Sequence, residues 1–152
     1  MLFVVRHAKA GSRRDFDGDD RMRPLTAAGY RQARALAPLL TAAGATSFLS
    51  SPFLRCIETL QPAATVVGAD VGIDGRLGEG RSSFDVIEMM ADLPDGCALC
   101  SHGDVIPETI AALERCGCAI TSAPDWRKGS VWVVSREGGE FTTAHVWPPP
   151  ET

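Results

Sequence analysis

The chain of 152 residues is 45% hydrophobic and 22% charged, a composition typical of one globular domain over residues 1–152. The formal net charge of −4 and the lack of any apolar run near the roughly 18 residues that span a bilayer argue against nucleic-acid and membrane partners. The first residues lack the charged start and cleavage site of a signal peptide, so we expect the protein in the cytoplasm.

The N-terminal part of the chain predicts a buried strand, a polar loop and a helix. Leu2–Val5 is a short apolar run, and residues 11–24 carry charges of both signs without periodicity. Thr26 is placed to cap a helix that runs to about Ala43, and Pro38 should kink or shorten that helix. The side chains expected on its buried face are Tyr30, Ala33, Leu36, Ala37 and Leu40.

A second strand and helix follow. Residues 46–49 predict the strand, and Ser51 and Pro52 are residue types that suit an N-cap and a first helical position. Residues 71–73 are a weaker strand candidate, followed by a glycine-rich segment. The side chains of the second helix expected to face the core are Leu54, Ile57 and Leu60.

The C-terminal half continues the alternation. We expect a helix over residues 84–93, a buried strand over 97–100 and a helix over 105–115. Residues 131–134 and 141–146 predict an antiparallel hairpin. This order predicts an α/β domain with three α/β/α layers and a mostly parallel central sheet. The helix over 84–93 should bury Phe84, Ile87 and Met90 or Ala91.

The five cysteines raise the question of a zinc site. Cys97 and Cys100 give C-x2-C, and Cys116 and Cys118 give C-x-C, a pattern similar to a four-thiolate site. Positions i and i+3 of a strand point to opposite faces, however, which weighs against Cys97 and Cys100 binding one ion. We therefore expect buried, reduced cysteines and no metal site.

Arginine and histidine side chains follow three of the predicted strands. Arg6 and His7 come directly after the first strand, and Arg55 lies in the first turn after the second. His102 follows the strand over 97–100. In open α/β sheets the ligand crevice lies outside the carboxyl ends of the strands, so these residues can converge. Nearby helix N-termini attract anions, and together these features predict a phosphate site.

Each of these residues also has a structural interpretation, because a single arginine or histidine at a strand end is more often solvated or hydrogen-bonded. His145, inside a late strand, is expected to be structural. Other phosphate chemistries are excluded by spacing: no cysteine precedes an arginine by six positions, and no GxxxxGK[ST] loop occurs. Histidine itself remains as the nucleophile.

The ordered motifs resemble those of the histidine phosphatase superfamily, whose fold is called phosphoglycerate-mutase-like. The family's Arg-His-Gly motif is present as RHA, its LTxxGxxQA motif as LTAAGYRQA, and its second-arginine and second-histidine motifs as SSPFLRCIET and SHG. An L-x-E motif ends at Glu79, and Ala8 replaces the usual glycine after the histidine. The motifs cover nearly the whole chain in the family's order.

Within this superfamily, the short length and the RHAK and RPLT segments are similar to SixA-type phosphohistidine phosphatases. RHAKAGSRRDFDGDD and RKGSVWVVS look even more like the phosphatase domain that is fused to MutT-type Nudix hydrolases. The resemblance implies a phosphorylated small molecule, a nucleotide or a phosphohistidine protein as substrate.

The resemblance also implies a mechanism that needs no metal and no cofactor. His7 would attack phosphorus and form a phosphohistidine intermediate, which water then hydrolyses. Glu79 would protonate the leaving oxygen and later activate water. Arg6, Arg55 and His102 would bind the phosphoryl oxygens. Lys9, Arg13 and Arg14 are candidates for binding a second anionic group on the substrate, with a solvated basic turn as the alternative.

Two functional hypotheses therefore stay open. The first is a metal-independent phosphatase that acts on a phosphomonoester or on protein phosphohistidine. The second is a phosphate- or nucleotide-binding module that docks a partner such as a separate Nudix hydrolase. The intact His7 and His102 favour the enzyme, because a binding module has no need of a nucleophile.

Overall fold

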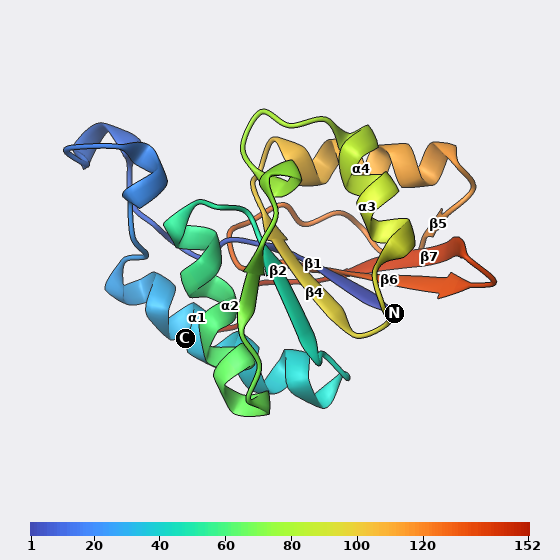
Figure 1. The fold of residues 1–152 in the computed structure, drawn as a ribbon, viewed down its shortest axis with the longest axis horizontal. Helices are drawn as coiled ribbons and strands as arrows, with labels where there is room; N and C mark the ends of the chain where they lie inside the picture. The colour runs from blue at the N-terminus through green and yellow to red at the C-terminus, as the bar shows by residue number, and fades with distance from the viewer.

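The computed structural model describes residues 1–152 and places one seven-stranded sheet between two layers of helices (Figure 1). The sheet order is β3-β2-β4-β1-β6-β7-β5, and β6 alone runs against its neighbours. The strands are β1 (Leu2–Arg6), β2 (Ser47–Ser50), β3 (Val71–Ile73), β4 (Cys97–Ser101), β5 (Ala119–Ile120), β6 (Val131–Glu137) and β7 (Glu140–Trp147). The helices are α1 (Ala27–Ala42), α2 (Leu54–Val67), α3 (Ser83–Asp92) and α4 (Val105–Arg115).

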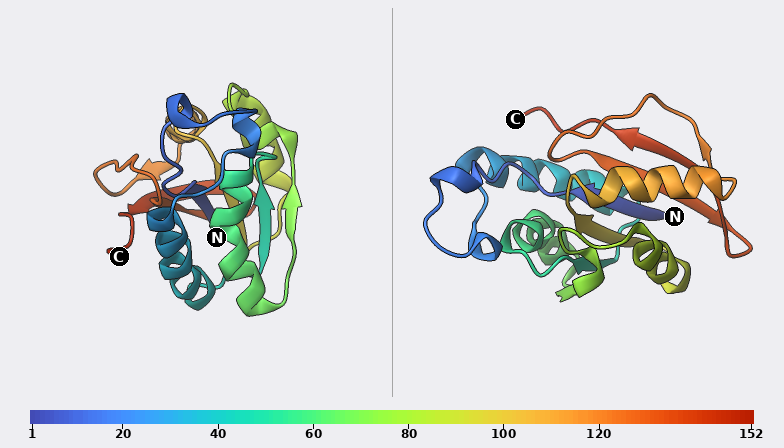
Figure 2. Two further views of the ribbon diagram at one scale, coloured as in Figure 1. Left: turned by 90° about the vertical axis from the view of Figure 1, so that its left-hand side faces the viewer. Right: turned by 90° about the horizontal axis from the view of Figure 1, so that it is seen from above.

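Both faces of the sheet are buried, because its strands contribute alternate side chains to two cores. In β1, Leu2 packs in the core with α3 and α4, whereas Phe3 packs in the core with α1 and α2. Figure 2 shows the two helical layers on either side of the sheet. The three-layer arrangement and the mostly parallel sheet are confirmed. In β4, Cys97 and Cys100 lie in different cores, as the strand period predicts.

The first helix differs from its prediction in two respects. α1 continues through Pro38 to Ala42, so the expected shortening is wrong. Pro38 is exposed, which lets water hydrate the carbonyl that loses its helical partner. Tyr30 is also exposed, and its hydroxyl donates to a Glu58 carboxylate oxygen instead of packing in the core. The Thr26 cap is confirmed by its hydroxyl oxygen, which accepts the Gly29 N–H at 3.1 Å.

The inward faces of α2 and α3 also differ from prediction. α2 begins at Leu54 after Phe53, so Ser51 is not its N-cap, and Leu54 and Ile57 are only half-buried. Arg55 lies on the buried face of α2 instead. Burying this charged side chain in the site places Leu54 and Ile57 nearer the surface. In α3, Phe84 is 71% exposed. The α3 residues that are buried are Val86, Met89 and Met90.

The central pair of strands creates the crevice that the site occupies. β1 and β4 are parallel neighbours, and Arg6 pairs with Ser101 at their carboxyl ends. The helices that follow them lie on opposite faces of the sheet, since α1 packs in one core and α4 in the other. Such a switch point leaves a crevice beyond the strand ends. No helix in the chain combines the length and apolar character that crossing a membrane requires.

Candidate active site

His7 is nearly buried just after β1, and one of its ring nitrogens is held by the backbone. Nδ1 lies 2.8 Å from the carbonyl oxygen of Ala8. A carbonyl can only accept, so Nδ1 carries the hydrogen and Nε2 keeps a lone pair. Burial, assisted by the charges of His102, Arg55 and Arg6, lowers the pKa of His7 to about 3. The imidazole is therefore neutral near pH 7.

His102 lies beside His7 because β1 and β4 end at the same level of the sheet. The two ring centroids are 5.5 Å apart. Nε2 of His102 lies 2.8 Å from the Ser51 hydroxyl, which explains why Ser51 is buried at the end of β2. Nδ1 of His102 is buried without a hydrogen-bond partner, 3.9 Å from Oε1 of Glu79. A buried nitrogen of this kind is well suited to bind a ligand oxygen.

The Arg6 side chain at the end of β1 is held by a backbone carbonyl and has space because a glycine lies beside it. Its Nη1 donates to the Trp126 carbonyl, while its Nε is buried without a partner. A Cβ placed on Gly103 would lie 2.7 Å from Cζ of Arg6. The glycine that follows His102 therefore leaves the room that the guanidinium occupies.

Arg55 is 1% exposed and contacts two carboxylates. Its Nη2 lies 3.2 Å from Oε1 of Glu79 and 3.2 Å from Oδ2 of Asp20, and its Nη1 donates to the Asp20 carbonyl at 3.0 Å. The guanidinium also lies over the Phe53 ring, 4.8 Å from its centroid. These contacts fix the charge of Arg55 at the base of the crevice.

Glu79 and Asp20 connect the rim of the site to its arginines. Glu79 accepts from Nη2 of Arg13 at 2.8 and 3.0 Å. Asp20 lies 2.8 Å from Nε of Arg23 and 3.3 Å from Nε of Arg13. Burial raises the pKa of Asp20. The hydrogen bond from Arg23 and the neighbouring arginine charges lower that pKa by more, so the net shift is downward. Asp20 therefore stays ionised and ties the 11–24 loop to Arg55.

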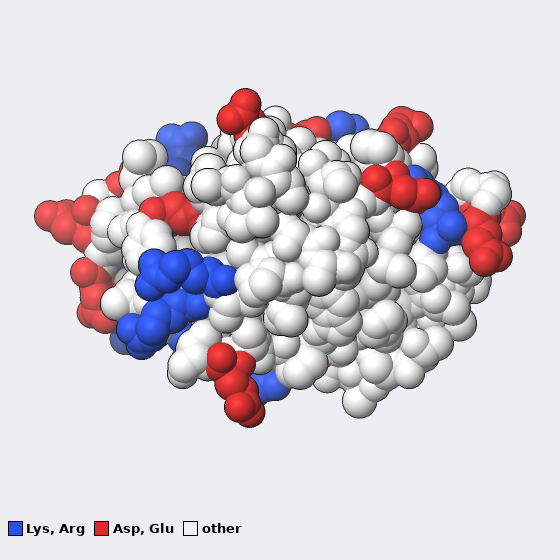
Figure 3. All heavy atoms as spheres, turned by 90° about the horizontal axis from the view of Figure 1, so that it is seen from below, with Lys and Arg blue, Asp and Glu red and all other residues white.

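Arg6, His7, Arg55 and Glu79 line a cleft of about 600 Å³. His102 and Asp20 contact these residues from outside the lining. Residues of the 11–24 loop form part of its wall. Six of the ten lining residues are Arg or Lys and only one is acidic, so the cleft is positive although the chain carries −4 overall. On the face drawn in Figure 3, basic side chains also gather toward the end of the molecule where this loop lies. The lining residues are Arg6, His7, Gly11, Ser12, Arg13, Arg14, Arg23, Arg55, Glu79 and Lys128.

The three residues expected to bind a second anion do not form one group. Arg13 and Arg14 line the cleft with His7, and Arg13 is paired with Glu79 and Asp20. Lys9 instead lines a neighbouring cavity. Its carbonyl accepts from the Thr26 N–H at 2.9 Å and from the Thr26 hydroxyl at 3.1 Å, so the chain after β1 runs against the start of α1.

Sequence reasoning missed Asp20, Lys128 and the role of Ser51. Asp20 was one of several acidic residues in a polar loop, and nothing in its spacing singles it out. The Ser-Pro pair is typical of a helix start, so the sequence assigns Ser51 to a cap and not to the site. Lys128 lies in the RKGS segment, whose similarity to the MutT-fused phosphatase domain was the one signal that pointed to it.

The cysteines are buried, as the sequence analysis expects, with one exception. All five are free thiols, and four of them are buried, whereas Cys116 is exposed. No group of three or more His, Cys, Asp or Glu side chains has an arrangement that could hold a metal ion.

Comparison with known proteins identifies phosphatases among the relatives. A family model described as the histidine phosphatase superfamily, branch 1, matches residues 2–83. An 8-oxo-(d)GTP phosphatase of Mycolicibacterium smegmatis is 34% identical over 157 residues, which cover 99% of this chain and 48% of that protein. The chain thus spans about half the length of this relative.

Two solved structures share the fold over most of their length. The protein histidine phosphatase SixA complexed with tungstate has a TM-score of 0.79 and 22% identity, covering 97% of this chain and 96% of that one. A mycobacterial glucosyl-3-phosphoglycerate phosphatase complexed with VO3 has a TM-score of 0.61 and 20% identity, covering 88% and 92%. At these identities the similarity establishes a common fold.

Proposed function

This chain belongs to the histidine phosphatase superfamily, branch 1, and from that premise we propose that it hydrolyses a phosphomonoester or a protein phosphohistidine through a covalent intermediate on His7. The main support is the neutral His7 ring, whose Nε2 lone pair is left free by the Nδ1 contact to the Ala8 carbonyl. A nitrogen in this state is a nucleophile at physiological pH. No metal ion takes part in the proposed reaction.

In the first step Nε2 of His7 attacks phosphorus in line with the leaving oxygen. The new P–N bond forms as the P–O bond breaks, and the leaving oxygen takes the electron pair and a proton from Glu79. In the second step water attacks the phosphohistidine, Glu79 accepts the proton of that water, and the P–N bond breaks to release inorganic phosphate and the free imidazole.

The oxygens of the transferred phosphoryl group bind to Arg6, Arg55 and His102. Arg6 and Arg55 each carry a buried Nε without a partner, and Nδ1 of His102 is in the same state. Donors fixed before the reaction stabilise the charge that develops on the phosphoryl oxygens. Substrate oxygens at Arg55 also compete with its contact to Glu79 at 3.2 Å, which releases the carboxyl group for proton transfer.

The substrate is proposed among phosphohistidine proteins, nucleotides and other phosphorylated small molecules. SixA supports the first class by its fold, and the relative named 8-oxo-(d)GTP phosphatase supports the second by sequence. The rival hypothesis, a module that docks a separate Nudix hydrolase, requires phosphate binding without turnover.

The decisive experiment uses labelled substrate and two histidine variants. Wild-type protein should release phosphate and, after a quench in base, retain label that acid removes, because phosphohistidine is acid-labile. His7→Ala should lose essentially all turnover and all retained label. His145→Ala in β7 is the matched control and should behave as wild type. Phosphate binding with no turnover and no label on any substrate class would support the docking module instead.

A further inference from the structure

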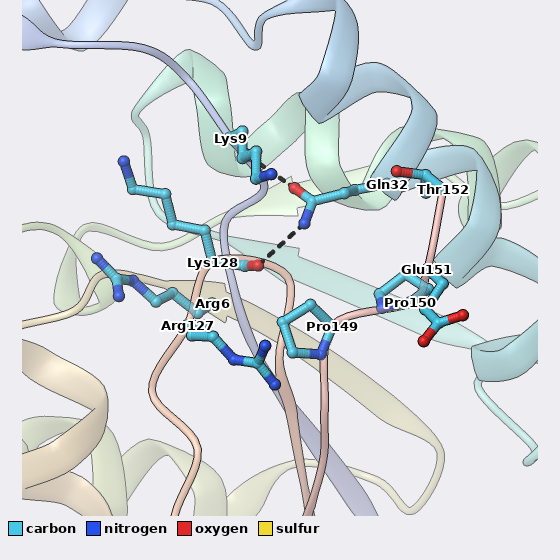
Figure 4. Close-up of a pocket in the computed structure, with 9 residues that line it drawn as sticks. All are labelled: Arg6, Lys9, Gln32, Arg127, Lys128, Pro149, Pro150, Glu151 and Thr152. Carbon is cyan, nitrogen blue, oxygen red and sulfur yellow. Dashed lines mark hydrogen bonds between the residues drawn. The ribbon is translucent and has the colours of Figure 1, made fainter.

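A second cavity of about 640 Å³ adjoins the cleft that holds His7. Arg6 and Lys128 line both spaces, so the two cavities share a wall. Figure 4 shows the side chains of these two residues extending in the same direction, away from Glu151. The full lining is Arg6, Lys9, Gln32, Arg127, Lys128, Pro149, Pro150, Glu151 and Thr152.

Three of the four cations that line this second cavity form no ion pair with a carboxylate. None of the ion pairs in the structure involves Arg6, Lys9 or Lys128. Arg127 is the one lining cation with a carboxylate partner, Asp125. Burial lowers the pKa of Lys128, and the nearby charge of Arg6 lowers it further. Four cations and one acidic side chain, Glu151, line this cavity, and Glu151 forms an ion pair with none of them. The like charges repel one another, and a bound anion lowers that cost.

Polar contacts hold the backbone from which the unpaired cations extend. The side chain of Gln32 is 4% exposed and bridges the two lysines through their backbones. Its Oε1 accepts from the Lys9 N–H at 2.9 Å, and its Nε2 donates to the Lys128 carbonyl at 3.1 Å (Figure 4). The Arg6 carbonyl in turn accepts from the Gly129 N–H at 3.1 Å. These contacts fix the backbone of Arg6, Lys9 and Lys128, so that their side chains start from set positions around the cavity.

We propose that the second cavity binds an anionic group on the leaving part of the substrate, so that the preferred substrates are small molecules with two phosphate groups. One phosphate would be transferred to His7, and the other would bind among Lys9, Arg127 and Lys128. Arg6 lies between the two positions and contacts both. This inference rests on the proposed phosphatase function and adds the substrate class to it.

The first test compares matched substrates whose leaving groups differ by one phosphate. Guanosine 3′,5′-bisphosphate and GMP form one pair, and a sugar bisphosphate and its monophosphate form another, so that both members of each pair are phosphomonoesters. We expect kcat/KM at low salt to be at least about tenfold higher for the doubly phosphorylated member, the effect of one extra charge-assisted contact. Equal kcat/KM values within both pairs would overturn the inference and leave the phosphatase function standing.

The second test removes the positive charges of the second cavity alone. Lys9→Gln and Arg127→Gln should each lower the kcat/KM ratio within a pair severalfold, because neither residue lines the His7 cleft. Arg115→Gln, an exposed arginine at the end of α4, is the charge-matched control and should leave the ratio unchanged. A ratio that stays constant in both cavity variants would contradict the assignment.

A binding measurement separates the inference from the proposed chemistry. We expect inorganic pyrophosphate to bind the full chain at least about tenfold more tightly than inorganic phosphate in calorimetric titrations, a gain of ~1.4 kcal/mol. Lys9→Gln should remove most of that difference. If no substrate is turned over but pyrophosphate keeps this advantage, the proposed function fails and the second anion site stands. Equal affinities would refute the site whatever the activity.

Discussion

At the scale of single residues, the site depends on groups that the fold leaves without protein partners. The neutral ring of His7, the unpartnered Nδ1 of His102 and the unpartnered Nε of Arg55 are all buried. Desolvation makes such groups costly to keep, and they persist because the surrounding backbone fixes them. The lack of a protein partner therefore both lowers the stability of the fold and leaves these groups free to act in the proposed phosphoryl transfer.

Acid should destabilise the fold partly through His7. Its pKa is about 3 in the folded chain against an ordinary value of 6.5, so the unfolded chain binds the proton first. This contribution is complete above the ordinary value and is lost as the pH falls from there toward 3. Between pH 7 and pH 5, wild type should lose ~2 kcal/mol more unfolding free energy than His7→Ala. Urea titrations at both pH values measure this, and equal losses would show that His7 titrates normally.

Glu79 should act on the leaving group, and its substitution should show which step it serves. Glu79→Gln keeps the size of the side chain and removes the proton. Turnover of alkyl phosphates should fall by about 10²–10⁴-fold, and turnover of an aryl phosphate with a good leaving group should fall far less. Glu108→Gln on the exposed side of α4 serves as the control. A uniform decrease across both substrate types would instead indicate a binding role through Arg55 and Arg13.

At the scale of elements, the central buried strands were predictable, whereas the short edge strand β5 and the helix faces were not. The apolar run at Leu2–Val5 and the buried run over 97–100 gave strands within one residue of those observed, because both are buried on each face. The convergence of Arg6, His7, Arg55 and His102 followed from strand order. The inward face of α2 could not be predicted, since periodicity assigns apolar residues to the core and here an arginine is buried.

The contact between α1 and the segment after β1 requires a glycine at position 29. A Cβ there would lie 1.9 Å from the carbonyl oxygen of Lys9, so Gly29→Ala forces two backbones apart. We expect a loss of about 1–3 kcal/mol in unfolding free energy, which exceeds the gain of at most about 1 kcal/mol in helix propensity. Denaturant titration checks this.

Gly75→Ala is the matched control for the same substitution, because a Cβ on Gly75 would meet no atom within 4 Å. That variant should unfold close to the wild-type midpoint. Gly29→Ala should also weaken binding in the second cavity, since Lys9 lies at the point of contact. Wild-type stability in Gly29→Ala would mean that the chain after β1 moves freely away from α1.

At the scale of the whole molecule, the family and the fold were predictable, and the surroundings of the site were not. Ordered motifs around His7 and His102 fixed the topology, and the switch point between β1 and β4 fixed where the crevice lies. The ion pairs of Asp20 and the second cavity at Lys128 depend on how the 11–24 loop and the segment before β6 fold back. Neither segment has the hydrophobic periodicity from which its backbone conformation could be predicted.

The distribution of charge over the molecule leads to a prediction about metal ions. The chain has a net charge of −4, yet six basic side chains and one acidic side chain line the cleft, so positive charge is concentrated where a phosphate dianion would bind. Fixed guanidinium groups can neutralise the charge that Mg²⁺ neutralises in other phosphatases. Activity should therefore change less than about twofold in excess EDTA, and added salt should lower kcat/KM by screening the cleft. A metal-dependent phosphatase in the same assay confirms that the chelator works. Loss of activity on chelation, restored by one particular divalent ion, would contradict the arginine-based mechanism and require a metal ligand set among the residues around His7.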